Sequence, residues 1–188
     1  MQEDNLIIHG LWIGSSLTQL ELLTLHSFVN HGHEFHLWAY NSIENQLPEK
    51  VVIQDANTII EESQIFRRQQ GDAKKNFGKG SYALFSDLFR VKLLYEKGGW
   101  WVDMDVTCLK PFDVPSPFYF RAHPILPLIG NVIKCPKGSE VMKASYIKMT
   151  EEVNSETKEW LLSNKIMNDM VEKYKLAKYI KGGLSNND

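Results

Sequence analysis

Residues 81–106 read SYALFSDLFRVKLLYEKGGWWVDMDV, and the order of features in this stretch decides the fold. Apolar side chains recur at helical spacing as far as Lys97, and Ser81 is suited to cap the start of such a helix. Gly98 stands where a residue in the left-handed conformation commonly ends a helix. A short apolar run follows at once, so the sequence predicts a largely buried helix that leads directly into a strand.

Two aspartates, Asp103 and Asp105, follow that apolar run. Successive side chains of an extended strand alternate between its faces, so both carboxylates are expected on one face, with Trp100, Val102 and Met104 on the other. The competing interpretation is that both carboxylates lie on solvent-exposed surface. A strand that carries two tryptophans is expected to be buried, which argues against this interpretation. Carboxylates shielded from water need a cation or a hydrogen-bonding partner, so the pair is a candidate metal and diphosphate site.

Asp87 and Arg90 interrupt the apolar surface of the predicted helix, three residues apart. Residues at this spacing lie on one helix face, so the two side chains can pair with each other or point together at a ligand. A structural ion pair is the competing interpretation, since buried pairs of this kind stabilise only weakly.

These residues resemble a known family. Their order and spacing are similar to the pattern Ser-Asp-x-x-Arg, Leu-Tyr and Gly-Gly-x-Tyr-x-Asp-x-Asp of the Asp-x-Asp sugar-binding glycosyltransferases, the capsular-polysaccharide and initiating α-mannosyltransferase group related to the glucosylating domains of large clostridial toxins. Trp101 departs from the pattern, because the family usually has Tyr there, so an aromatic ring is kept and a hydroxyl is lost. The opening segment LIIHGLWIG, residues 6–14, is also similar, and the resemblance spans residues 6–140.

The resemblance implies a GT-A fold, a Rossmann-like nucleotide-sugar domain, and a retaining, metal-dependent glycosyltransferase. Such an enzyme moves a sugar from a nucleoside diphosphate sugar to a saccharide, a lipid-linked saccharide or another hydroxyl acceptor, as in polysaccharide biosynthesis. The resemblance makes Asp105 the ligand of Mn²⁺ or Mg²⁺, assisted by Asp103, which also contacts ribose or the donor sugar. Trp12 would stack on the base. The implied catalytic residues are Asp103, Asp105 and Arg90, and the implied donor-binding residues are Trp12, Gly14, Asp87, Arg90 and Asp103.

Two other functions compete with this interpretation. The segment 102–107 also fits the haloacid-dehalogenase phosphatases, in which Asp103 would be a nucleophile that forms an aspartyl-phosphate. That fold needs a later acidic pair for Mg²⁺, and no aspartate after Asp105 stands in such a context. The other alternative is a domain that binds a nucleotide sugar without transferring it, because a fold does not fix a function.

The rest of the chain alternates predicted strands and helices, which is typical of an α/β fold with a mainly parallel sheet and helices on both faces. Ligands of such sheets bind beyond the carboxyl ends of the strands, where Trp12, Gly14, Asp103 and Asp105 are expected. The predicted strands are residues 5–13, 34–39 and 51–54, the predicted helices are residues 17–30, 56–66 and 81–97, and residues 69–80 are a predicted polar loop.

Length and composition agree with a small globular enzyme. The 188 residues are 43% hydrophobic and carry a net charge of −2, so they can bury one core and have no general affinity for nucleic acid. Neither a signal peptide nor a transmembrane segment is apparent, so the expected location is the cytoplasm or the inner face of the membrane as a peripheral protein. The oligomeric state is not indicated.

We expect one glycosyltransferase domain over residues 1–188, with a donor-binding core in residues 1–140 and a helical part in residues 141–188. Family members usually complete the metal shell from a C-terminal segment, often with a His, yet no His follows His123. The last part is therefore expected to be either truncated or closed by another residue type such as Asn. It shows no recognisable chemistry of its own, and Trp160 is expected on the packing face of its helix.

Overall fold

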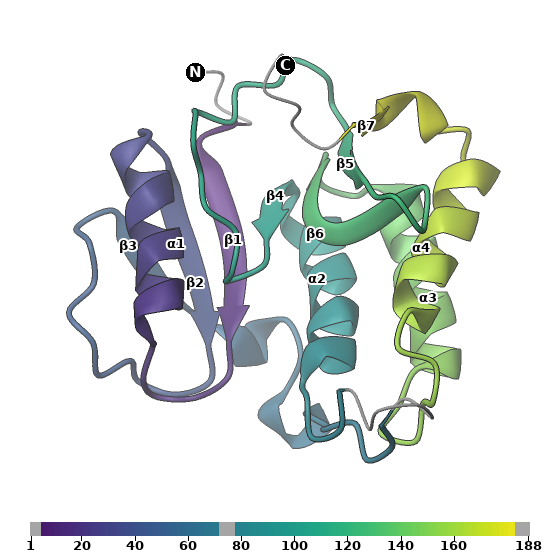
Figure 1. The fold of residues 1–188 in the computed structure, drawn as a ribbon, viewed down its shortest axis with the longest axis horizontal. Helices are drawn as coiled ribbons and strands as arrows, with labels where there is room; N and C mark the ends of the chain where they lie inside the picture. The colour runs from purple at the N-terminus through teal and green to yellow at the C-terminus, as the bar shows by residue number, and fades with distance from the viewer. Residues whose placement is uncertain (1–4, 72–77, 183–188) are drawn as a thin grey trace.

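The computed structural model describes residues 5–71 and 78–182, which form one mixed sheet with helices on both of its faces (Figure 1). Within these residues the sheet has seven strands in the order β3-β2-β1-β4-β6-β5-β7. Strands β3, β2, β1 and β4 are parallel, β6 runs antiparallel to β4 and β5, and β7 is parallel to β5. The expectation of a mainly parallel α/β sheet is confirmed. The strands are β1 (Ile7–Trp12), β2 (Glu34–Ala39), β3 (Val51–Asp55), β4 (Gly99–Val102), β5 (Tyr119–Ala122), β6 (Leu128–Cys135) and β7 (Ile180–Lys181).

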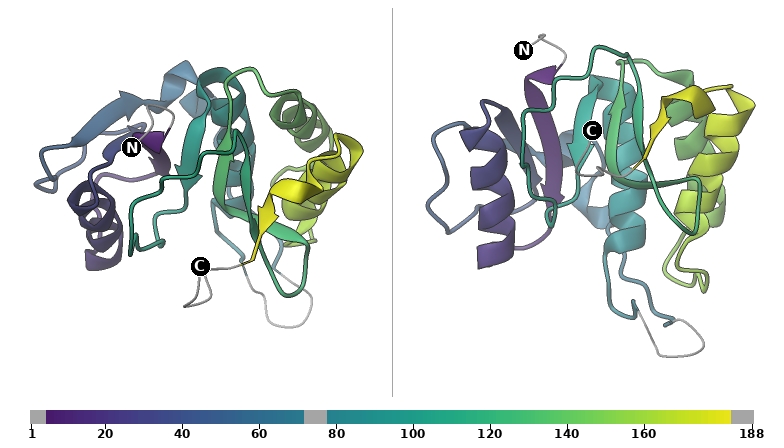
Figure 2. Two further views of the ribbon diagram at one scale, coloured as in Figure 1. Left: turned by 90° about the horizontal axis from the view of Figure 1, so that it is seen from above. Right: turned by 45° about the horizontal axis from the view of Figure 1, so that its top comes forward.

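The helices divide between the two faces of the sheet, as Figure 2 shows. Helix α1 (Gln19–Asn30) covers one face, and α2 (Ala83–Lys97), α3 (Glu140–Glu152) and α4 (Leu162–Lys173) cover the other. Each face has its own core. Trp100 packs into the core beneath α1 and Trp101 into the core beneath α2, as the alternation of side chains along β4 requires.

Helix α2 and the strand after it agree with the sequence prediction except at the helix start. The helix begins at Ala83, two residues later than expected, and the Ser81 hydroxyl accepts a hydrogen bond from the Ala83 amide over 3.0 Å. Gly98 ends the helix with a φ of 72°, a conformation that other residues rarely adopt. The turn from α2 into β4 therefore depends on this glycine.

The predicted helix over residues 56–66 is wrong. Two short 3₁₀ helices, η2 (Ala56–Thr58) and η3 (Glu62–Gln64), stand there instead. The Asp55 carboxylate accepts the Asn57 amide over 2.9 Å, and the Asn57 side chain accepts the Glu62 amide over 2.9 Å. Such local bonds from side chain to backbone compete with the continuous helical ladder.

Residues 72–77, in the middle of the predicted polar loop, lie outside the described residues. Across the described part of the chain, no helix combines the length and the apolar character needed to span a membrane. The short helix η4 (Ala177–Tyr179) precedes the last strand.

Candidate active site

The candidate site lies where β1 and β4 end. Figure 1 shows that the N-terminal ends of α2 and α4 reach the same edge of the sheet. The expectation that Asp103 and Asp105 continue an extended strand is wrong, because β4 ends at Val102. The Asp103 amide donates to the Asn131 carbonyl over 3.0 Å, and the Val106 amide donates back to the Asp103 carbonyl over 3.1 Å, which closes a turn. Both carboxylates therefore project from one turn rather than from one strand face.

One oxygen of the Asp103 carboxylate is held in place by a hydrogen bond and an ion pair. The Trp101 indole N–H donates to Asp103 Oδ1 over 2.8 Å, and Arg90 Nη1 lies 3.4 Å from the same oxygen. The tryptophan that replaces the usual tyrosine thus supplies a hydrogen bond of its own. No hydrogen bond to the second oxygen is found among the described residues, so that oxygen can face a ligand.

Arg90 is the buried centre of the site, with an exposed fraction of 5%. Its Nη2 pairs with Asp87 Oδ1, and its guanidinium lies 5.5 Å from the centre of the Trp101 ring. A Cβ atom at Gly130 would overlap the guanidinium, so this position on β6 leaves the space that Arg90 fills. Burial lowers the pKa of Arg90, and the negative charge of Asp103 opposes that shift. The predicted pair of Asp87 and Arg90 exists, and it extends to Asp103.

A cavity of about 330 Å³, here called cavity A, opens beside this group. Its walls come from the first turns of α2, from β6, and from the loop and first turn of α4. The polar side chains that line it are those of Ser86, Asp87, Arg90, Asp103, His123, Asn131 and Asn164. Three of the residues that we expected to contact the donor therefore meet at one cavity.

The sequence interpretation missed the contribution of the last third of the chain to cavity A. Trp160 and Asn164 line the cavity, although this segment had shown no chemistry and Trp160 had been expected on a packing face. The Asn164 side chain accepts the Gly130 amide over 2.9 Å, and the Asn168 side chain accepts the Leu128 amide over 3.0 Å. The Asn-x-x-x-Asn spacing on a helix was the available signal, because residues four apart share one helix face.

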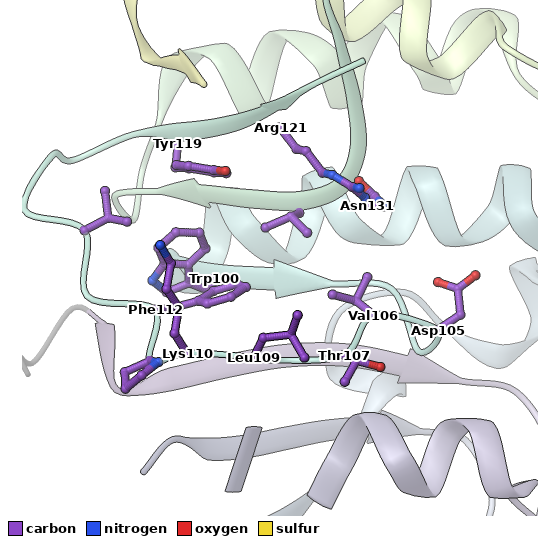
Figure 3. Close-up of a pocket in the computed structure, with 13 residues that line it drawn as sticks. Trp100, Asp105, Val106, Thr107, Leu109, Lys110, Phe112, Tyr119, Arg121 and Asn131 are labelled. Atoms are coloured by element: carbon purple, nitrogen blue, oxygen red, sulfur yellow. The ribbon is translucent and has the colours of Figure 1, made fainter. Parts of the chain in front are cut away.

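A second cavity of about 430 Å³, here called cavity B, lies on the other face of β4 and β6 (Figure 3). Trp100, Phe112 and Tyr119 give it an aromatic lining, and Figure 3 shows Arg121 extending toward Asn131 near the end where Asp105 stands. Asn131 lines both cavities, and its side-chain oxygen is buried with no hydrogen-bond partner in the described part of the chain.

The surroundings of Asp105 concentrate negative charge. Its side chain is exposed, yet partial loss of hydration raises the pKa of the Asp105 carboxyl, and the charge of Asp103 raises it further, while Arg121 lowers it. A divalent cation would relieve this repulsion, and carboxylate oxygens suit Mn²⁺ and Mg²⁺.

Within residues 5–71 and 78–182, no cluster of three or more His, Cys, Asp or Glu side chains forms a complete metal cage. The two carboxylates fit the other common arrangement, in which a protein holds Mg²⁺ through one or two carboxylates and the substrate phosphates supply further ligands.

Trp12 and Gly14 lie at the same edge of the sheet but line neither cavity. Trp12 is the last residue of β1, the parallel neighbour of β4, and its indole N–H donates to the Ser16 carbonyl over 3.0 Å. Gly14 has a φ of 143°, and its position lies close to the same indole. Their roles in donor binding stay predictions.

The sheet order, the helices on both faces and the acidic turn after β4 define an α/β nucleotide-sugar fold of the GT-A type. A family model described as "Glycosyltransferase sugar-binding region containing DXD motif" matches residues 23–121, and this chain belongs to that family of glycosyltransferases. The resemblance found in the sequence is confirmed. The phosphatase interpretation of Asp103 has no support from this family.

A bacterial protein matches much of this chain. Subversion of eukaryotic traffic protein A from Legionella pneumophila is 23% identical over 155 residues, and the match covers 72% of this chain. The match covers only 23% of that relative, so the chain spans about a quarter of its length.

Two solved structures share the fold. The PaToxG glycosyltransferase superposes with a TM-score of 0.61 at 16% identity, over 89% of this chain and 68% of that one. The structure of a mutant transferase gives a TM-score of 0.58 at 12% identity, over 97% of this chain and 93% of the other. At such identities the likeness concerns the fold alone.

Proposed function

We propose that this chain binds a nucleoside diphosphate sugar together with Mn²⁺ or Mg²⁺ and transfers the sugar, with retention of configuration, to a hydroxyl acceptor. The observation that carries the proposal is the meeting of Asp87, Arg90 and Asp103 at cavity A, with Asp105 on the adjoining turn. A volume of about 330 Å³ is within the range of small-molecule sites.

Each of these side chains has a chemical task in the proposal. Asp87 accepts hydrogen bonds from sugar hydroxyls, and Arg90 holds that carboxylate in position through its rigid fork of donors. Asp103 presents its second oxygen to ribose or to the sugar. Asp105, with Asp103, would hold the cation, which would neutralise the charge that develops on the leaving diphosphate.

The two free cysteines of the described chain are both buried and line neither cavity, so neither thiol is placed to act as a covalent nucleophile. Rate enhancement would come from positioning of donor and acceptor and from fixed charges around the leaving group.

We infer that the acceptor enters through cavity B. This cavity opens beside Asp105, and Asn131 joins its wall to that of cavity A. Retention requires that the acceptor approach the anomeric carbon from the side of the leaving diphosphate. The largely aromatic and aliphatic lining favours an acceptor whose hydroxyl is carried by an apolar group.

The proposal is tested by a hydrolysis and transfer screen across UDP- and GDP-sugars, with Mn²⁺, with Mg²⁺ and with EDTA. We expect one donor to be consumed only when a divalent cation is present. NMR of the first-formed product of an α-linked donor should show the α anomer. A β product would contradict retention, and donor binding without hydrolysis or transfer would favour the non-catalytic alternative.

A further inference from the structure

Arg68 is a buried cation outside the residues discussed above. Its exposed fraction is 1%, and it lies in the segment that precedes α2. Its Nε donates to the Thr157 carbonyl over 2.9 Å and its Nη2 donates to the Lys158 carbonyl. One guanidinium thus binds two successive carbonyls of the loop between α3 and α4, and its planar fork fixes their position.

The backbone around Arg68 joins both walls of cavity A. The Arg68 amide donates to the Ser81 carbonyl over 3.0 Å, just before α2, and the Gly80 amide donates back to Arg68 over 2.7 Å. The next amide, of Gln69, donates to the Ser155 carbonyl over 2.7 Å, in the loop before α4. The first turns of α2 and α4, which both line cavity A, are therefore held together through this segment.

The same guanidinium contacts Trp160, whose side chain lines cavity A. The guanidinium carbon lies 5.4 Å from the centre of the indole ring, within the range of a cation–π interaction. A Cβ atom at Gly78 would overlap the indole, and Gly78 has a φ of +75°, which side chains rarely tolerate. The Trp160 indole therefore packs against the Arg68 guanidinium and occupies space that a side chain at position 78 would fill.

We infer that Trp160 is a specificity-determining wall of cavity A that contacts the sugar of the donor, and that Arg68 is the positioning residue that holds the indole there. The inference rests on the proposed function, since it assumes that the sugar occupies cavity A. Trp160 offers an apolar surface to the C–H groups of a pyranose ring, while Asp87 and Asn164 offer polar groups to its hydroxyls. The wall acts on the sugar and not on the nucleotide.

The test compares the affinity for a nucleotide sugar with that for its nucleoside diphosphate, both in Mn²⁺, using the base that the wild type prefers. Trp160→Ala should weaken binding of the nucleotide sugar by about tenfold or more and leave the affinity for the nucleoside diphosphate unchanged. Arg68→Lys keeps the positive charge but loses the planar guanidinium that binds two carbonyls. It should also weaken binding of the nucleotide sugar and leave the affinity for the nucleoside diphosphate unchanged.

Arg67→Lys is the matched control for Arg68→Lys. Arg67 is the exposed neighbour of Arg68, its guanidinium lies 4.5 Å from the centre of the Tyr82 ring, and it lines neither cavity. This control should change neither affinity. All variants are measured below the melting temperature of the least stable one, so that a loss of binding reports the site and not unfolding.

Fluorine NMR of protein labelled with 5-fluorotryptophan tests the positioning role directly. The Trp160 resonance, assigned by its absence in Trp160→Phe, should shift in Arg68→Lys and in Gly78→Ala and stay in place in Arg67→Lys. An unshifted resonance in Arg68→Lys would overturn the positioning role.

Equal weakening of nucleotide sugar and nucleoside diphosphate in Trp160→Ala would overturn the specificity role. A wild type that binds no nucleotide sugar would instead overturn the proposed function and with it the donor contact of Trp160, while the fluorine spectra would still decide what Arg68 does.

Discussion

Replacement of Arg90 by Met separates the structural part of the Asp87–Arg90 pair from its functional part. Arg90 has an exposed side-chain fraction of 6% and Asp87 one of 13%, whereas Asp103, the other partner of Arg90, is 35% exposed. Arg90→Met therefore leaves one carboxylate buried without its cation and another that water can reach.

The size of the effect follows from this difference in burial. Removal of one partner of a buried pair costs about 3–5 kcal/mol, because the remaining charge is neither hydrated nor paired. For a chain of this length each kcal/mol lowers the melting temperature by roughly 2–4 °C, so we expect a fall of roughly 10 °C. The double variant Asp87→Leu/Arg90→Met removes both charges and should recover stability to within about 1–2 kcal/mol of the wild type.

Urea unfolding at pH 7 measures these changes, with Lys165→Met as the control. Lys165 pairs with Glu159 at the surface, where the side chains are 51% and 46% exposed, so its loss should cost less than about 1 kcal/mol. The reasoning would be refuted if Arg90→Met cost no more than the control, or if the double variant were as unstable as the single one.

The same double variant also tests donor binding. If Asp87 and Arg90 contact the sugar, the folded double variant should bind a nucleotide sugar poorly while keeping its affinity for the nucleoside diphosphate. Full donor affinity in this variant would remove both residues from the site and leave Asp103, Asp105 and Trp12 as its remaining parts.

Three further predictions follow from the charges of the site and the core. The pKa of Asp105 is raised by partial burial, so its ionisation favours the unfolded chain and the free energy of unfolding falls as the pH rises through that pKa. Asp105→Asn should therefore leave the melting temperature at pH 7 unchanged or slightly raised. A clear fall in melting temperature would contradict this prediction. Burial lowers the pKa of His9 to about 3, so the free energy of unfolding should be at its full value above about pH 6.5 and should fall as the pH drops toward 3. Urea titrations should show that the free energy of unfolding depends less on pH in His9→Gln than in the wild type. The same dependence on pH in both proteins would argue against the burial effect. Arg121→Gln should reduce sugar transfer to an aryl glycoside severalfold without slowing donor hydrolysis, and an effect no larger than that of Arg67→Gln would move the acceptor away from cavity B.

The parts of the fold that sequence predicts well are those with local causes. Helix α2 and strand β4 follow from apolar periodicity and from Gly98, whose positive φ ends the helix. Asp87 and Arg90 were expected to pair because of their spacing on the helix, and the family resemblance implied that Asp103 contacts the donor with them.

The parts that sequence did not predict depend on contacts between distant segments. The Asp103 amide still bonds to Asn131 on β6, a strand whose register no local pattern reveals, and the chain then turns through the bond from the Val106 amide to the Asp103 carbonyl. Trp160 and Asn164 reach cavity A because α4 is bonded to β6 through asparagine side chains. Their residue types alone indicate only packing and a helix surface.

Calorimetry of UDP- and GDP-sugars against the wild type and Asp105→Ala, each with Mn²⁺ and with EDTA, tests the central claim most directly. We expect the wild type to bind one of these nucleotide sugars in Mn²⁺ and to lose that binding in EDTA. In EDTA the wild type and Asp105→Ala should show the same absence of binding. Equal binding by the wild type in Mn²⁺ and in EDTA would contradict a cation site at the turn of Asp103 and Asp105.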